Sequence, residues 1–202
     1  MSWTFEKPSS DEIRVILVRH GESTFNAQGR HQGSSDESVL TELGKSMARQ
    51  TGKFLSGLTV DALYVSSLRR AQETASEMLS MMTPAVNLQN VHVVWQLREI
   101  DLPAWQGLCH KDVRTKFAEE YRCWKQSPHQ FSMEDPHTKQ RFLSRARTLR
   151  AIATILAGNI ASSPRANLII SQSFGHQSGF DKYCVESYTC LLSCFQTIQL
   201  WN

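Results

Sequence analysis

An apolar run near the N-terminus constrains this chain more than any other feature. The run from Ile13 to Val18 is rich in β-branched residues and ends abruptly at Arg19, His20 and Gly21, as a buried β-strand would. At the carboxyl end of such a strand, the loops of an open α/β sheet form a ligand crevice. Arg19 can fork two hydrogen bonds onto a phosphate, and His20 can attack phosphorus or carry a proton near neutral pH. The pair therefore indicates phosphoryl chemistry.

The string around this histidine is longer than an isolated Arg-His-Gly, which occurs by chance in many chains. It runs from Leu17 to Ser23 and continues at Asn26 and over residues 29–36. This extended string resembles the opening signature of the histidine phosphatase superfamily, which includes the cofactor-dependent phosphoglycerate mutases. The resemblance implies that His20 is the catalytic nucleophile. It also implies that the residues binding the substrate phosphate include Arg19, Asn26, Gln32 and Gly33.

Length and composition favour a single globular domain over residues 1–202. A chain of 202 residues can bury roughly 70% of the surface that its unfolded form exposes. Its 41% hydrophobic and 20% charged residues lie in the ordinary globular range. No apolar run in the sequence approaches the ~20 residues that span a bilayer. The first residues lack a signal-peptide core, and Asp11 and Glu12 argue against a transit peptide, so we expect a cytoplasmic protein.

Charge and cysteine usage argue against several classes of partner. A net charge of +3 is too small and too dispersed to indicate nucleic acid binding, although clustered arginines can still serve a small anion. The five cysteines include no CxxC pair. In an intracellular chain of this size they are most often reduced and packed, so disulfide and zinc interpretations each have odds of roughly one in ten. No metal is implied.

The residues after the first strand predict a loop and then a helix. The stretch from Gly21 to Asp36 is rich in Gly, Ser, Asn and Asp and has little periodicity, which is typical of a loop. Thr41 is a plausible helix cap, and Gly57 ends the helical pattern. The apolar residues that recur at helical spacing, and should face the core, are Leu43, Met47, Phe54 and Leu55.

A second strand over residues 61–66 should run directly into a helix that begins with two arginines. The helix would bury Leu68, Ala71, Ala75, Met78 and Leu79. Cations at a helix N-terminus cost a few tenths of a kcal/mol each unless an anion lies nearby. Arg69 can pair with Glu73 four residues later, which leaves Arg70 unexplained. In the superfamily, the second arginine of a similar Ser-Ser-Leu-Arg-Arg segment reaches the phosphate, and that position is Arg70.

A third strand over residues 91–97 precedes an irregular stretch that carries two acids, Glu99 and Asp101. Either acid could simply be solvated. The segment resembles the superfamily's Leu-Arg-Glu string, which implies that Glu99 protonates the leaving oxygen. An alkoxide leaves poorly without a proton, and desolvation by Ile100 and Trp105 would raise the pKa of Glu99 into range. We expect Asp101 to orient neighbouring groups or the loop.

The middle of the chain predicts two further helices with a loop between them. An amphipathic helix is expected over residues 110–126, with Val113, Phe117, Tyr121 and Trp124 inward, then a loop over 131–137 and a long helix over 138–159. By analogy with the superfamily, the insertion over about 109–137 is a lid that caps the site. His129 and His137 have no metal-ligand spacing, so we expect both on the surface.

The C-terminal region departs from the superfamily pattern, which expects a strand that ends directly in a second histidine. The strand over 167–171 is followed by Gln172, and the next histidine is His176. Gln172 has the better position, but a neutral amide cannot supply positive charge to a dianionic phosphate. His176 has the better chemistry, at the cost of four extra loop residues, and we favour it slightly as the third catalytic residue. Residues 172–202 are thus divergent, although 191–201 suit a terminal strand.

Taken with its motifs, the chain is expected to adopt a three-layer α/β/α sandwich with a mostly parallel central sheet. Within the superfamily it looks most like the cyanobacterial and plant group of probable 2-carboxyarabinitol-1-phosphatases. This resemblance implies a phosphatase that hydrolyses a small phosphorylated metabolite through phosphohistidine at His20, without metal or cofactor. Two alternatives stay open, a phosphoglycerate mutase and a catalytically impaired phosphate-binding protein. The sequence indicates neither the substrate nor the oligomeric state.

Overall fold

The computed structural model describes residues 13–127, 130–139, 141–143, 155, 166–172 and 195–200. Five strands form one sheet in the order β3-β2-β6-β1-β7. Four of them run parallel, and β7 pairs antiparallel with β1. The α/β class with a mostly parallel sheet is therefore confirmed. The strand bounds are β1 (Ile13–Arg19), β2 (Ala62–Ser66), β3 (Val91–Val94), β6 (Ala166–Gln172) and β7 (Phe195–Leu200).

The register brings the carboxyl ends of the four parallel strands to one edge of the sheet. Arg19 at the end of β1 pairs with Gln172 at the end of β6. Ser66, which ends β2, pairs with Val94, which ends β3. His20, which directly follows β1, therefore lies at this edge of the sheet.

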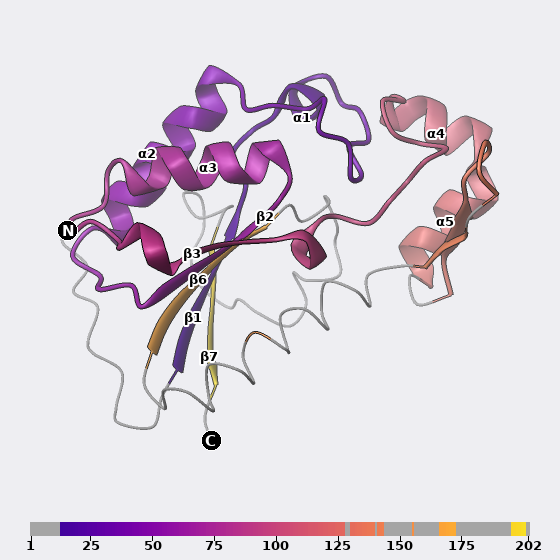
Figure 1. The fold of residues 1–202 in the computed structure, drawn as a ribbon. Helices are drawn as coiled ribbons and strands as arrows, with labels where there is room; N and C mark the ends of the chain where they lie inside the picture. Colours follow the sequence, from indigo (N-terminus) through magenta and orange to yellow (C-terminus); the bar gives the residue numbers. More distant parts are fainter. Residues whose placement is uncertain are drawn as a thin grey trace.

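Each face of the sheet has its own apolar cluster, because successive side chains of a strand point to opposite faces. Ile16 and Val18 of β1 belong to one cluster, and Val15 and Leu17 belong to the other. The helices α2 (Glu42–Leu55) and α3 (Arg69–Leu79) cover the first face, as Figure 1 shows. Ile155, the one described residue between positions 144 and 165, is helical and packs on the second face.

Helix α2 begins as predicted but buries a different face. The Thr41 side chain caps it by accepting a hydrogen bond from the Gly44 N–H. Leu43, expected inside, is 58% exposed, so that prediction is wrong. The buried positions are Gly44, Ala48, Thr51, Gly52 and Leu55. Small residues face inward because a Cβ atom added at Gly44 or Gly52 would lie 2.0 Å from a backbone oxygen of the neighbouring segment.

Two further predictions need correction in the first half of the chain. The expected loop over 21–36 contains a short helix, α1 (Thr24–Ala27). Ser23 caps this helix and forms a reciprocal capping box with Asn26, a local signal for a helix start. The predicted third strand is also shorter than expected, because β3 is followed by a 3-10 turn, η2 (Trp95–Leu97); another such turn, η1 (Leu88–Asn90), precedes β3.

The predicted helix over 110–126 is two helices, α4 (His110–Lys116) and α5 (Ala118–Gln126). The chain breaks at Phe117, whose φ of −127° and ψ of 46° are not helical. The next segments form an antiparallel hairpin, β4 (Ser132–Glu134) and β5 (Arg141–Leu143), so the predicted loop over 131–137 and the helical start at 138 are wrong. Between the two strands, Asp135 accepts hydrogen bonds from the N–H groups of His137 and Thr138. The remainder of the predicted helix over 138–159 lies outside the described residues, except Ile155.

Residues from 102 to 133 share a third apolar cluster, separate from the two on the sheet. It contains Leu102, Trp105, Val113, Trp124, Phe131 and Met133. In Figure 1 the helices α4 and α5 lie to one side of α2 and α3. The segment over about 109–137, predicted as a lid, thus has a small core of its own.

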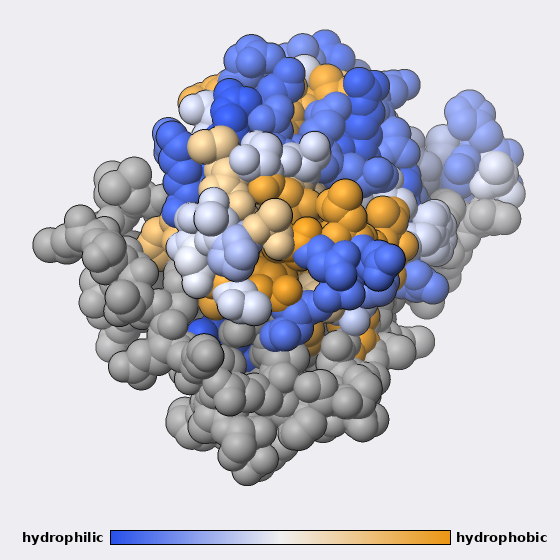
Figure 2. Space-filling model, turned by 60° about the vertical axis from the view of Figure 1, so that its left-hand side comes forward, coloured by the Kyte–Doolittle hydropathy of each residue, from blue (hydrophilic) through white to orange (hydrophobic). Residues whose placement is uncertain are grey.

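Large exposed apolar side chains gather near one edge of the sheet. Leu88, Val93 and Trp95 lie in or beside β3, the edge strand. Figure 2 shows an apolar area on one face of the molecule, bordered by hydrophilic surface. No helix within the described residues is long and apolar enough to cross a membrane.

Candidate active site

The first strand delivers His20 to the carboxyl edge of the sheet, where its ring is almost completely buried. The ring Nδ1 lies 2.6 Å from the carbonyl oxygen of Gly21. Because a carbonyl only accepts hydrogen bonds, we assign the ring proton to Nδ1. The Nε2 atom, which then carries a lone pair, is buried and has no hydrogen-bond partner among the described residues. The imidazole is therefore oriented as a nucleophile.

The surroundings keep this imidazole neutral. The pKa of His20 is lowered from 6.5 to about 3, chiefly by burial and then by the positive charges of Arg70 and Arg19, whereas the Gly21 hydrogen bond opposes the shift. At neutral pH the ring therefore carries no net charge, and the Nε2 lone pair is available without prior loss of a proton.

Arg70 is a fully buried cation that is bonded to the loop over residues 33–36 and lies within electrostatic reach of His20. Its two terminal nitrogens donate hydrogen bonds of 2.8 Å to the carbonyl oxygens of Ser35 and Gly33. The pKa of Arg70 is lowered to about 10, chiefly by burial, with the charges of Glu99 and Asp36 opposing part of that effect. Arg70 thus remains protonated at neutral pH and can offset negative charge beside His20.

Arg69 has the separate role that the sequence predicted for it. Its Nε lies 3.0 Å from Glu73 Oε1 on the same helix, and the pair is partly exposed. The other Glu73 oxygen accepts a hydrogen bond from the Leu40 N–H. The ion pair predicted between Arg69 and Glu73 is confirmed, and it faces away from the buried side of α3.

Asn26 and Gln32 meet at a buried serine. The Ser23 hydroxyl lies 2.9 Å from Asn26 Oδ1 and 2.7 Å from Gln32 Oε1. A second buried hydroxyl, that of Ser38, lies 3.0 Å from the same Gln32 oxygen. Asn26 Oδ1 also accepts from the Ser23 N–H at 3.3 Å, which leaves the single hydroxyl proton of Ser23 for the Gln32 oxygen. The NH₂ groups of Asn26 and Gln32 are then donors available to an anion.

Gly33 contributes to the site through its backbone, since glycine has no side chain. Its φ of 51° lies in the left-handed region that glycine adopts without strain. A Cβ atom there would lie 2.9 Å from side-chain atoms of Gln106. Its carbonyl oxygen accepts the Arg70 hydrogen bond already described. The position therefore favours glycine chiefly for its backbone conformation, since the flexible Gln106 side chain can shift.

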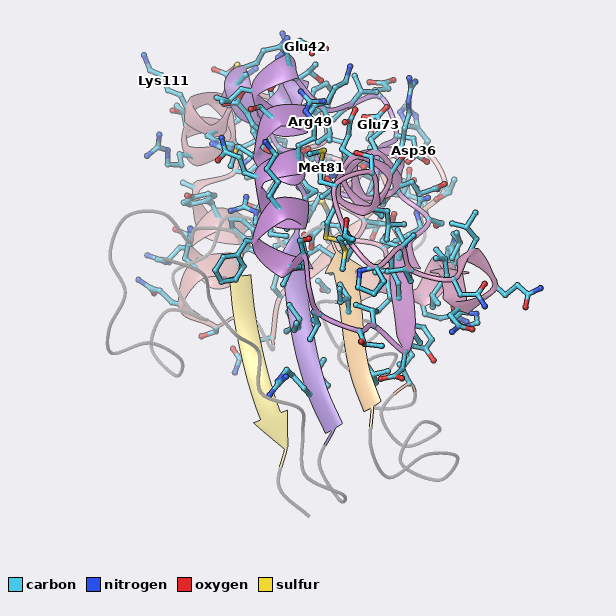
Figure 3. All side chains as sticks on the ribbon, turned by 90° about the vertical axis from the view of Figure 1, so that its left-hand side faces the viewer. Asp36, Glu42, Arg49, Glu73, Met81 and Lys111 are labelled. Carbon is cyan, nitrogen blue, oxygen red and sulfur yellow. The ribbon has the colours of Figure 1, made fainter. Side chains whose placement is uncertain are left out.

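The loop over 33–36 makes hydrogen bonds with the start of α3, with Arg98 and with Asp101. One Asp36 oxygen accepts a 2.9 Å hydrogen bond from the Arg69 N–H, and the other lies 3.0 Å from Arg98. Asp36 thus places a carboxylate at the N-terminus of α3. The N-cap residue of that helix, Leu68, provides no side-chain hydrogen bond of its own. Figure 3 shows Asp36 and Glu73 beside this helix, which is seen nearly end-on. Asp101 accepts a hydrogen bond from the Ser34 hydroxyl, so it contacts the loop, and its role in orienting that loop stays a prediction.

Glu99 lies on the same side of the molecule as this charged cluster. Its side chain is half-buried, and Oε1 accepts a 3.1 Å hydrogen bond from the Ile100 N–H. Its negative charge raises the pKa of Arg70, so the carboxylate lies within electrostatic reach of the buried guanidinium. The predicted role as proton donor stays a prediction.

Two residues that the sequence analysis missed hold the turn after His20. Thr74 of α3 accepts a 3.1 Å hydrogen bond from the Gly21 N–H. On the opposite side, a Cβ atom at Gly21 would lie 2.3 Å from the carbonyl oxygen of Gly44 in α2. The turn is therefore in close contact with both helices. Neither partner was identifiable from local sequence, although Gly44 interrupts an otherwise ordinary amphipathic pattern.

His31, which the sequence analysis did not single out, lies beside the third apolar cluster. His31 is 7% exposed, and its ring lies 5.4 Å from that of Trp105 and 5.7 Å from that of Trp124, between centroids. Its Nε2 and both indole nitrogens are buried without hydrogen-bond partners among the described residues. Burial, followed by the charge of His110, lowers the pKa of His31 to about 4.

No metal centre is evident among the residues that the structure describes. In that part of the chain, no three His, Cys, Asp or Glu side chains come together as ligands. His137 is exposed, as predicted, and His129 lies outside the described residues. Cys109 and Cys123 are unpaired thiols.

Comparison with known proteins identifies the family. The profile of the histidine phosphatase superfamily (branch 1) matches residues 15–161. The chain belongs to this superfamily. A probable 2-carboxy-D-arabinitol-1-phosphatase from Arabidopsis thaliana is 38% identical over 67% of the chain, but the match spans only 27% of that relative's own length.

Other members differ in the reaction that their names describe. A 2,3-bisphosphoglycerate-dependent phosphoglycerate mutase from Hamiltonella defensa is 35% identical over 61% of this chain and 51% of its own. Among solved structures, Bacillus stearothermophilus YhfR matches with a TM-score of 0.64 and 27% identity, over 79% of this chain and 74% of its own. The superfamily is therefore established, whereas the names of these relatives do not assign one substrate to this chain.

The histidine phosphatase match covers His20, Arg70 and Glu99 but ends before the strand β6. The backbone of Gln172, at the end of β6, pairs with Arg19, the residue before His20. The Gln172 side chain and the whole of His176 lie outside the described residues. Which of the two completes the site stays a prediction.

Proposed function

We propose that the chain is a phosphatase that hydrolyses small phosphate monoesters through a phosphohistidine formed at His20. One observation carries the proposal. A neutral, buried imidazole presents an Nε2 lone pair without a hydrogen-bond partner, beside the buried cation Arg70. His31 also has a buried Nε2 without a partner, but its ring lies among the aromatic rings of Trp105 and Trp124. The ring of His20 instead lies within electrostatic reach of Arg70 and Arg19, two cations that can hold a phosphate for attack by Nε2.

In the first step, the Nε2 lone pair of His20 attacks the substrate phosphorus in line, and the bond from phosphorus to the ester oxygen breaks. Glu99 gives its proton to the departing oxygen, so the substrate leaves as a neutral alcohol. Arg19 and Arg70 offset the charge on the equatorial oxygens. The neutral donors proposed for the same oxygens are the amides of Asn26 and Gln32 and the backbone of Gly33.

Phosphorylation makes the His20 ring cationic, because Nδ1 keeps its proton while Nε2 bonds to phosphorus. The Gly21 carbonyl, 2.6 Å from Nδ1, accepts a stronger hydrogen bond from this charged ring. In the second step, the Glu99 carboxylate removes a proton from water, the water oxygen bonds to phosphorus, and the P–N bond breaks. Inorganic phosphate leaves, and Nε2 and Glu99 return to their starting states.

The direct test is isolation of the intermediate. Rapid quenching during turnover of a phosphate-labelled substrate should trap label that is labile in acid and stable in alkali. His20→Gln should lose this label, whereas His137→Gln, a change at an exposed histidine, should retain it. Label that persists in the His20 variant would show that the nucleophile is a different residue.

A mutase is the second candidate, because the Hamiltonella defensa relative bears that name. A mutase would return the phosphoryl group to a bound acceptor instead of to water, and its activity would depend on a bisphosphoglycerate primer. A screen over sugar phosphates, phosphoglycerates and an aryl phosphate, each with and without the primer, separates the two reactions.

A catalytically impaired binding protein is the third candidate, since Gln172 stands where the superfamily pattern expects histidine. It would bind phosphate esters measurably without turnover. Measuring the affinity of the protein for inorganic phosphate, alongside the activity screen, distinguishes this case from an enzyme whose substrate was absent from the screen.

A further inference from the structure

A chain of hydrogen bonds connects the helix that carries Arg70 to the ring of His20. Thr74 lies one turn after Arg70 on α3 and is 1% exposed. Its hydroxyl oxygen is 2.8 Å from the carbonyl oxygen of Arg70 and 3.1 Å from the backbone nitrogen of Gly21. The carbonyl oxygen of Gly21 in turn accepts from His20 Nδ1.

The chemistry of the groups fixes the direction of each bond. The Thr74 hydroxyl has one proton, and the Arg70 carbonyl can only accept it. Toward Gly21 the same oxygen is therefore an acceptor, which is what the Gly21 N–H requires. Gly21 is thus held at both ends, through its N–H by α3 and through its carbonyl by the histidine ring.

The contact between Gly21 and helix α2 does not replace the hydrogen bond from Gly21 to Thr74. Gly44 approaches Gly21 closely but makes no hydrogen bond to it. The following residue is held separately, since the Glu22 carbonyl accepts from the Thr41 N–H at 3.0 Å. Within the described residues, Thr74 is the one hydrogen-bond partner of the Gly21 N–H, and Gly21 is buried.

We propose that Thr74 is a positioning residue, which fixes His20 relative to Arg70 for attack on phosphorus. The inference rests on the proposed function, because it assigns Thr74 a part in the same reaction. Thr74→Val keeps the branched shape but leaves the Gly21 N–H buried without a partner. That peptide is then expected to rotate toward another acceptor, and the adjoining His20 ring would move with it.

Three variants test this role by steady-state kinetics on an aryl phosphate. Thr74→Val should lower kcat by about 10²-fold, the effect of misplacing a reacting group by about 1 Å. KM should change much less, because Arg19 and Arg70 are intact. Thr74→Ser retains the hydroxyl and should restore most of kcat. Thr51→Val removes the hydroxyl of a buried threonine in α2 that is 6% exposed, and it should leave kcat unchanged.

A measurement without turnover separates this inference from the proposed function. In wild-type protein, nitrogen chemical shifts of His20 should report one tautomer protonated at Nδ1, and the Gly21 amide should exchange slowly with solvent. Thr74→Val should accelerate that exchange and mix the tautomers, whereas Thr74→Ser should not. If wild-type protein forms no phosphohistidine, the proposed function fails, and these spectra still test Thr74. Unchanged exchange and tautomer in Thr74→Val, or a Thr74→Ser variant as slow as Thr74→Val, would overturn the inference.

Discussion

Replacing Gly44 with alanine should weaken catalysis more than it weakens the fold. The new Cβ would lie 2.0 Å from the carbonyl oxygen of Glu22, and contacts under 3.0 Å are essentially never tolerated. Helix α2 and the turn after His20 must therefore separate by about 1 Å, the difference between these distances. Overpacking of this kind costs about 1–3 kcal/mol, whereas alanine gains about 1 kcal/mol over glycine in a helix. The net loss is on the order of 1 kcal/mol, or about 2–4 °C in Tm for a domain of this size.

A separation of about 1 Å at the catalytic turn can lower the rate by about 10²-fold. Gly52 offers a matched control, because a Cβ there would lie 2.0 Å from the Met78 carbonyl oxygen. Gly52 lies two helical turns along α2 from Gly44 and so away from the turn after His20. Gly52→Ala should lower Tm by a similar amount and leave single-turnover phosphorylation nearly intact. A wild-type rate of phosphorylation in Gly44→Ala, or an equally slow rate in Gly52→Ala, would contradict this prediction.

Two other predictions concern Glu99 and His31. Glu99→Gln should slow substrates with poor leaving groups by about 10²-fold or more relative to an activated aryl phosphate, since only the former need the proton; equal slowing of both would limit Glu99 to binding. The pKa of His31 is about 4 in the folded protein and 6.5 ordinarily, so the unfolded chain binds more protons between these values, and stability is lost as the pH falls through that window. His31→Phe should reduce this loss and keep or raise stability at neutral pH, because it removes an unpaired buried nitrogen. Urea midpoints on both sides of the window check this, and an unchanged pH dependence in the variant would contradict it.

The parts of the fold that the sequence predicted are those set by local pattern. Strand β1 and its abrupt end at Arg19 follow from one continuous apolar run. The distinction between Arg69 and Arg70 also follows from local spacing, because a pairing with Glu73 four residues later accounts for only one of them. Such signals are contained within a few residues, so a single sequence is sufficient to interpret them.

The contacts that position the site were not predictable because they join distant segments. Asp36 reaches the start of α3 across 33 residues, and Thr74 meets Gly21 across 53. The packing of α2 was missed for a related reason. Its inner face contacts backbone at Gly44 and Gly52, so apolar periodicity, which assumes contacts between large side chains, assigned Leu43 to the wrong side.

The helix expected over 110–126 illustrates a third limit. Its apolar residues have helical spacing throughout, and nothing in the composition of the segment marks the break at Phe117. The hairpin that follows pairs residues 132–134 with 141–143, and each of these strands is too short for alternation to identify.

The position of β1 within the sheet also determines when the strand that leads to His20 can acquire its neighbours during synthesis. Its neighbours are β6 and β7, so Ile13 pairs with Ala166 on one side and with Leu200 on the other. A ribosome must therefore make more than 150 further residues before either edge of β1 is covered. Pairings at such sequence separation form slowly, and an uncovered apolar strand is prone to aggregate in the meantime. The earliest part of the site to be translated is thus among the last to acquire its native neighbours, and nascent chains that stop before β6 should depend on chaperones.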